Sequence, residues 1–289
     1  MKKFFLIIII IGTISGIFFV FHSEIFKIYS EFFTNLPEIE KNIGDIAKKV
    51  QKQINVPPPL KAGDEDPEAF LTKSGVIQLT NTERKKNGLA LLQENLKLNA
   101  SAQTKLNDMF KTQYFEHTSP SGIGVSDLAK NEGYEFIIIG ENLAMGNFKD
   151  NQTLVQGWMD SPGHRANILN PQYKEIGVAV GKGEFQGHAT WISVQHFGTP
   201  LSVCPEPASS LKQKIDFNGI NLDSMKQELN YLQTGLENTM PGTSNYQKLV
   251  REYNSLVSQY NALAEKTKSL VNQYNQQVQG FNTCVSGLK

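Results

Sequence analysis

The residues that decide the fold are 158–170, which read WMDSPGHRANILN. Ser161 suits the position that caps a helix, and Pro162 suits the first helical turn, where its missing N–H would have no partner in any case. Gly163 adds backbone freedom, and His164 follows it directly. The stretch therefore predicts a short helix at a tight corner that carries chemically active side chains.

Three further motifs accompany this stretch: FEH at residues 115–117, GENLA at 140–144 and VQHFG at 194–198. Together with the string from Asn81 to Leu96, these motifs resemble the CAP superfamily. That family includes the cysteine-rich secretory proteins, antigen 5 and the pathogenesis-related 1 proteins, whose shared unit is also called the SCP domain. The chain has only two cysteines, and this resembles the bacterial branch rather than the cysteine-rich eukaryotic one.

The resemblance covers residues 72–200 and implies an α+β fold, a three-layer α/β/α sandwich. The hydrophobic pattern agrees with such a fold, because apolar residues change between helical and strand spacing along this part of the chain. Helices are expected up to Gly88 and over residues 96–110, 125–132 and 151–159, and strands over 134–140, 176–180 and 190–197.

The resemblance also implies a site. In the family, a histidine and a glutamate from the first two motifs face a central cavity, and His117 and Glu141 match them. A carboxylate can accept one ring N–H of a histidine and leave the other nitrogen free for a metal or a water. Two such histidines would suit zinc or another divalent metal, so His117 and His164 are the candidate metal ligands.

In the second half of this site, the chain departs from the family's pattern. This chain has Ser161 where animal and plant members have a second glutamate, and Ile192 where they have a second histidine. His164 of SPGHR is expected to fill the vacancy, as in bacterial members. His196 remains a fourth candidate, although it follows Gln195 and neighbouring strand residues face opposite sides of a sheet.

The expected cavity residues are therefore His117, Glu141, His164 and His196, and the motif residues that support them are Ser161, Arg165, Asn142 and Gln195. His188 is rejected, because placing it in the family's histidine position puts the motif glutamine out of register.

Three roles for this set remain open. The side chains could serve structure alone, with His164, Glu141 and Arg165 tying loops to the sheet through charge-assisted hydrogen bonds of about 1.5–3 kcal/mol each. They could instead line a cavity for a ligand or metal. Catalysis is disfavoured, because the motif region has no cysteine, no GxSxG elbow and no third metal ligand.

The amino terminus predicts a membrane anchor. Lys2 and Lys3 precede residues 4–21, an uncharged run that would span about 27 Å as a helix, close to the thickness of a bilayer core. A cleaved signal peptide is the alternative, but no small-residue cleavage site follows the run. The expectation is a single-pass protein of the cell membrane, with the lysines inside and the CAP domain extracytoplasmic.

Residues 22–71 are expected to form an amphipathic stalk and a proline-rich linker that contains Pro57-Pro58-Pro59. The predicted domains are residues 1–21 as the anchor, 22–71 as stalk and linker, 72–203 as the CAP domain and 204–289 as a helical hairpin.

The carboxyl-terminal part predicts an antiparallel coiled-coil hairpin. Its apolar residues recur at spacings of three and four, interrupted only at Thr267 and Gln277, and Pro241-Gly242 separates the two arms. Cys204 and Cys284 are equidistant from residue 244, so two arms leaving that turn bring them together. A disulfide is predicted here, and two free buried thiols are the alternative.

Composition limits the choice of partners. The chain has 28 basic and 28 acidic residues among 289, so no net positive charge favours nucleic acid. The expected partners are the membrane and a cell-wall, lipid or protein ligand, with self-association through the stalk or coiled coil. The leading function is a ligand-binding or interaction module at the cell surface; the alternatives are a metal-dependent hydrolase and a lipid-binding protein.

Overall fold

The computed structural model describes residues 52–62 and 68–288. These residues fall into two compact units, one made of residues 52–206 with 280–288 and the other of residues 207–279. The described part contains no helix that is both long and apolar enough to cross a bilayer. The predicted anchor over residues 4–21, and most of the predicted stalk, lie outside the described residues.

The first unit is built on a mixed sheet with the strand order β1-β4-β6-β5-β3, in which β2 also pairs with β4. The three long strands β4, β6 and β5 are antiparallel, whereas β1 and β2 run parallel to β4, and β3 runs parallel to β5. The strands are β1 (Gln53–Asn55), β2 (Leu60–Lys61), β3 (Gln93–Glu94), β4 (Phe136–Met145), β5 (Glu175–Phe185) and β6 (His188–Pro200).

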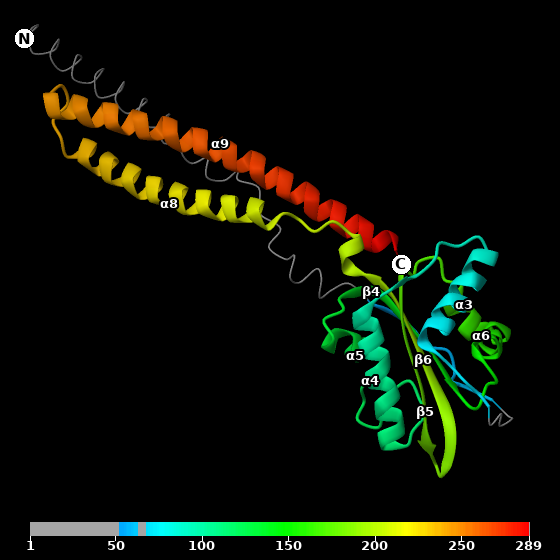
Figure 1. Ribbon diagram of the computed structural model, residues 1–289. Coiled ribbons are helices and arrows are strands. Elements are labelled where there is room, and N and C mark those ends of the chain that lie inside the picture. Colours follow the sequence, from blue (N-terminus) through cyan, green and yellow to red (C-terminus); the bar gives the residue numbers. More distant parts are fainter. Residues whose placement is uncertain (1–51, 63–67, 289) are drawn as a thin grey trace, which may run out of the picture. The chain divides into compact units, whose positions relative to one another are not determined.

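Helices cover both faces of this sheet, as the sandwich prediction requires (Figure 1). One face carries α4 (Leu96–Thr112) and α5 (Val125–Asn131), and the other carries α3 (Lys73–Lys86), α6 (Asn151–Asp160) and α7 (Pro162–Ile168). Side chains at the residues before α3, α4 and α6 accept backbone N–H groups of the first turn, which fixes where each helix begins. These caps are Thr72, Asn95 and Asp150.

The structure differs from the sequence prediction before residue 72. Residues 53–61 were expected in a linker, but they add β1 and β2 to the edge of β4, with Pro57-Pro58-Pro59 between the two short strands. Proline has no N–H to give to a sheet ladder, so it suits this interruption at an edge. Periodicity could not reveal strands of only three and two residues.

The second unit is a hairpin of two antiparallel helices, α8 (Ser209–Glu237) and α9 (Ser244–Gly287) as far as residue 279, joined by a turn in which Gly242 has a φ of 86°. Apolar residues of both helices form its core. The two interruptions of the apolar pattern make bonds between the arms: Thr267 accepts from the Asn218 side chain at 3.0 Å, and Gln277 accepts from the Ala208 N–H at 2.9 Å.

The predicted disulfide is present and belongs to the first unit. Cys204 and Cys284 are bonded, with their α-carbons 5.7 Å apart and a sequence separation of 80. The last turns of α9 contribute Phe281 and Val285 to the same core as Trp158. The bridge therefore fixes residues 280–288 to the domain that carries the sequence motifs.

Candidate functional site

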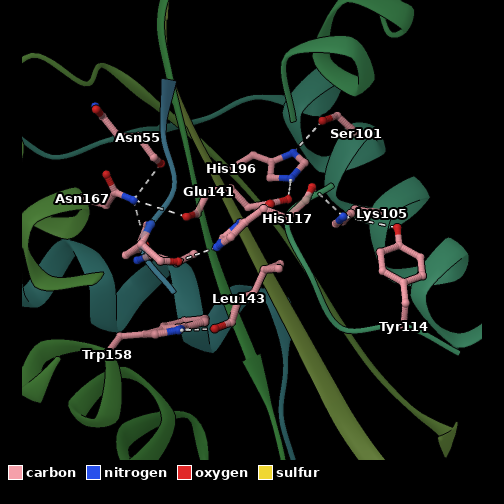
Figure 2. Close-up of polar contacts among 12 residues, drawn as sticks. Asn55, Ser101, Lys105, Tyr114, His117, Glu141, Leu143, Trp158, Asn167 and His196 are labelled. Atoms are coloured by element: carbon pink, nitrogen blue, oxygen red, sulfur yellow. Dashed lines mark hydrogen bonds and ion pairs between the residues drawn. The ribbon is translucent and has the colours of Figure 1, made fainter. Parts of the chain in front are cut away.

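The centre of the site is the carboxylate of Glu141, whose side chain is completely buried. Glu141 lies on β4 directly opposite His196 of β6. One carboxylate oxygen is 2.6 Å from His117 Nδ1 and the other is 2.8 Å from His196 Nε2 (Figure 2). The carboxylate thus joins two histidines that are far apart in sequence.

His196 is held from both sides within the domain. Its Nδ1 lies 2.6 Å from the hydroxyl of Ser101 on α4, and both His196 and Ser101 are completely buried. Because the serine hydroxyl can donate, His196 can be neutral, with Nδ1 accepting from Ser101 and Nε2–H donating to Glu141.

His117 has a different pair of partners. Its Nδ1 faces Glu141, and its Nε2 faces the main-chain carbonyl of Pro57. Both of these partners can only accept, so His117 satisfies both when each ring nitrogen carries a proton. In that form the cluster consists of a Glu141 carboxylate, a His117 cation and a neutral His196, and its charges balance.

The electrostatics of Glu141 agree with this arrangement. Burial by itself raises the pKa of a carboxyl group, but here the hydrogen bonds from His117 and His196, with the electrostatic attraction of His196 and then of Lys105, outweigh burial. The pKa of Glu141 falls to about 2, so the group is ionised at neutral pH.

Lys105 of α4 positions the loop that carries His117. Its buried ammonium donates to the His117 main-chain carbonyl at 2.8 Å and to the Tyr114 hydroxyl at 3.3 Å. The Tyr114 hydroxyl in turn donates to Asp108 at 2.7 Å. Burial lowers the pKa of Lys105, and the charge of Glu141 opposes that change. Sequence reasoning missed Lys105 because a lysine on a helix usually faces solvent.

The opposite face of the same two strands carries a network of neutral amides. The Asn142 side chain donates to the His164 main-chain carbonyl at 3.2 Å and to the Gln195 side chain at 3.1 Å. Gln195 donates to the hydroxyl of Thr80 on α3 at 2.7 Å, and Asn142 accepts from Asn167 of α7 at 2.9 Å. Asn142 and Gln195 thus join α3 and α7 to the sheet.

His164 does not bond to Glu141 or to either of the other histidines. Its Nδ1 lies 2.8 Å from Ser161 Oγ, so Ser161 begins α7 as predicted but bonds this ring instead of a backbone N–H. The buried Nε2 lies near the Leu143 carbonyl without a hydrogen bond of normal geometry. Burial, and then the charge of His117, lower the pKa of His164 to about 4.

The remaining predicted residues contribute less. Arg165 is exposed and makes no side-chain hydrogen bond or ion pair with any residue the structure describes, so the structure does not support the alternative in which it ties a loop to the sheet. His188, which was rejected, is exposed next to the turn between β5 and β6. The structure brings together His117, Glu141 and His196, and it places His164 on α7 beside Ser161.

The residues do not fit the predicted metal site in this arrangement. Both ring nitrogens of His117 and of His196 already have hydrogen-bond partners. Within residues 52–62 and 68–288, no three or more His, Cys, Asp or Glu side chains are grouped so that they could hold a metal ion. A zinc ion bound to proteins takes three or four such ligands.

Known proteins share the domain that carries this site. Residues 77–197 match the cysteine-rich secretory protein family, CAP. The uncharacterized protein YkwD of Bacillus subtilis (strain 168) is 45% identical over 103 residues, which are 36% of this chain and 40% of that protein. The uncharacterized membrane protein YlbC of the same organism is 35% identical over 107 residues, 37% of this chain and 31% of that protein.

A solved extracellular protein containing an SCP domain, from Bacillus anthracis str. Ames, is 30% identical over 44% of this chain and 39% of that chain, with a TM-score of 0.38. The match covers less than half the length of each of these relatives. The resemblance to the cysteine-rich secretory protein (CAP) family that the motifs predicted is thus confirmed over residues 77–197.

Proposed function

We propose that the protein is a membrane-anchored, extracytoplasmic binding module whose CAP domain holds its ligand through His117. The observation that carries this proposal is the Nε2–H of His117, which donates to a main-chain carbonyl outside the cluster. Every other ring nitrogen of the cluster is engaged inside the domain. A histidine fixed as a donor suits binding, whereas general base catalysis needs a nitrogen free to accept a proton.

The metal-dependent hydrolase is the less supported alternative. A metal would have to displace the Glu141 or Pro57 contact of His117, and His164 would have to supply a second ligand. The low pKa of His164 would keep its ring neutral, as a metal ligand must be. No contact in the described part of the chain favours the lipid-binding alternative.

The anchor and the location are part of the same proposal. The uncharged run at residues 4–21 after Lys2 and Lys3 supports a single membrane span with the CAP domain outside. One relative is named as a membrane protein, and a disulfide persists best outside the cytoplasm. We also propose that α8 and α9 supercoil as a coiled coil that presents the module to partners.

The test measures retention of the full-length protein on envelope material. Purified cell-wall material and, separately, phospholipid vesicles are incubated with the protein in detergent, and bound protein and released fragments are measured. The expected result is retention on cell-wall material that His117→Ala abolishes and His188→Ala, a change at an exposed histidine, leaves intact. Stoichiometric metal lost in His117→Ala together with released fragments would favour the hydrolase, and retention on vesicles alone would favour lipid binding.

A further inference from the structure

Residues 52–62, which we call the strap, lie along the edge of β4 next to His117. The strap pairs with β4 at Asn55 opposite Gly140 and again at Leu60 opposite Ala144, and it leaves the sheet over the prolines between these points. The Glu141 carbonyl accepts from the Asn167 side chain at 3.3 Å, and the Leu143 carbonyl accepts from the Trp158 side chain at 3.3 Å. The domain thus satisfies these two carbonyls of β4 without the strap.

Two side-chain donors of the domain face carbonyls of the strap. Asn167 Nδ2 donates to the Asn55 carbonyl at 3.2 Å (Figure 2). His117 Nε2 donates to the Pro57 carbonyl, two residues further on. A site that offers N–H donors at alternate residues of an extended segment recognises carbonyl groups and needs no N–H in return. Proline-containing segments suit such a site, because proline lacks the N–H and is already extended.

The domain is shaped to let this segment approach. A Cβ at Gly163 would lie 2.6 Å from the Pro57 Cβ, so a side chain larger than hydrogen there would push the strap away. At one end of the strap, the Lys52 ammonium lies 3.5 Å from Glu135 and 4.4 Å from the centre of the Phe136 ring. The site therefore also favours a basic residue at the start of the segment.

The strap itself is weakly held. None of its residues is buried, and Ile54 and Val56 keep 47% and 42% of their surface exposed, whereas nine of the ten residues of β4 are buried. Segments with few buried side chains open at low free energy. A strap of this kind can leave its site while the domain stays folded.

We propose that Asn167 and His117 form a binding site for an extended, proline-containing peptide from another molecule, and that the strap occupies this site as an internal competitor. This inference rests on the proposed function and names the class of ligand. A tethered segment competes at an effective concentration on the order of millimolar, so the free chain would bind weakly until the strap is released.

The experiment uses the full-length protein in detergent and a fluorescent peptide with the sequence KQINVPPPLKA, residues 52–62. The strap is weakened by the double substitution Asn55→Ala and Leu60→Asp, which removes the Asn55 bond to Tyr173 and the contact of Leu60 with the core. Hydrogen exchange over residues 52–62 reports release of the strap. Fluorescence anisotropy is expected to show peptide binding at least about tenfold tighter than to the unaltered chain.

Site variants and peptide variants decide the outcome. In the released background, His117→Ala is expected to weaken binding by about tenfold or more, since a charge-assisted bond is lost, and His188→Ala to leave it unchanged. A peptide with alanines in place of its three prolines is expected to bind less tightly. The inference would be overturned if the released protein bound the peptide no better than a scrambled peptide, or if His117→Ala left its binding unchanged. It would also be overturned if residues 52–62 stayed protected from hydrogen exchange in the double variant.

The same variants separate this inference from the proposed function. If the released protein fails to bind the peptide but still sediments with cell-wall material in a His117-dependent way, only the peptide assignment fails. If His117→Ala has no effect on either measurement, both proposals fail.

Discussion

Two faces of one pair of strands carry different kinds of polar chemistry. On the face toward α4, Glu141 and His196 form a charged cluster with His117. On the face toward α3 and α7, their sequence neighbours Asn142 and Gln195 form a network of neutral amides. Because side chains alternate along a strand, the two adjacent residues in each motif serve opposite sides of the sheet.

The two networks differ in how they contact the strap, the segment that can leave the domain. The amide network connects helices of the domain to its sheet, and its Asn167 also bonds to the strap, at the Asn55 carbonyl. The charged cluster ends at the exposed strap, through the His117 contact with Pro57. We infer that Asn142 and Gln195 of the neutral face hold the scaffold together, and that the domain meets a ligand where His117 of the charged face and Asn167 border the strap.

The largest expected effect is the loss of the shared carboxylate. Glu141→Ala leaves two histidines without their acceptor inside the protein, and breaking a buried ion pair in this way costs about 3–5 kcal/mol of unfolding free energy. Urea denaturation followed by tryptophan fluorescence measures it, because both tryptophans of the chain, Trp158 and Trp191, lie in this unit. Glu141→Gln, which keeps the shape, is the matched control with a smaller loss. A loss below about 1 kcal/mol for Glu141→Ala would contradict the central role of this carboxylate.

Lowering the pH should remove the stabilising contributions of the two faces in different pH ranges. The folded pKa of His164 is lowered from 6.5 to about 4, so its contribution to stability is present above pH 6.5 and is lost as the pH falls toward 4. The folded pKa of Glu141 is lowered from 4.5 to about 2, so its contribution is present above pH 4.5 and is lost as the pH falls toward 2. That second loss is about 3 kcal/mol.

Urea midpoints measured from pH 7 to pH 2 test this order. Glu141→Gln should remove the loss below pH 4.5 and keep the one above it. If the variant and the unaltered protein lose stability in parallel from pH 7 to pH 2, the charged face does not cause the loss of stability below pH 4.5.

A smaller effect is expected on the neutral face. Asn142→Ala removes one acceptor and two donated hydrogen bonds and leaves the Gln195 and Asn167 side chains short of partners, at a cost of about 1–3 kcal/mol. Asn147→Ala is the matched control, because Asn147 makes a single long bond of 3.4 Å to the Ala189 carbonyl. If Asn142→Ala costs as much as Glu141→Ala in the same urea assay, the two faces do not differ in the way proposed.

Much of the fold and of the site behind this comparison could be predicted from the sequence. What could not be predicted depends on contacts between residues far apart in the sequence. Long periodic segments predicted the helices and central strands, and the motif order predicted that His117 and Glu141 meet. Alternation alone made His196 the weaker candidate, because it showed that His196 and Gln195 face opposite sides without showing which side held Glu141. Only the register of β4 against β6 places Glu141 opposite His196.

The strap and Lys105 were beyond sequence reasoning. A run of three prolines is typical of a linker, and nothing local shows that Gln53–Asn55 before it pair with residues 85 positions later in the sequence. The burial of Lys105 depends on the loop that follows α4, whose path is a tertiary feature. The helical hairpin was easier, because its apolar spacing and its Pro-Gly turn are both local signals.

The smallest expected effect concerns the neutral end of the charged cluster. Ser101→Ala removes the hydroxyl 2.6 Å from His196 Nδ1 and leaves that buried nitrogen without a partner, which should lower the unfolding free energy by about 1 kcal/mol. The Glu141 carboxylate still requires a donor from His196 Nε2, so the tautomer should not change. Nitrogen NMR of the histidine rings measures this directly: Nε2 of His196 should stay protonated in both proteins, and Nδ1 should stay unprotonated. A proton on Nδ1 in the unaltered protein would mean that Ser101 accepts instead of donates, and the charge balance assigned to the cluster would then be wrong.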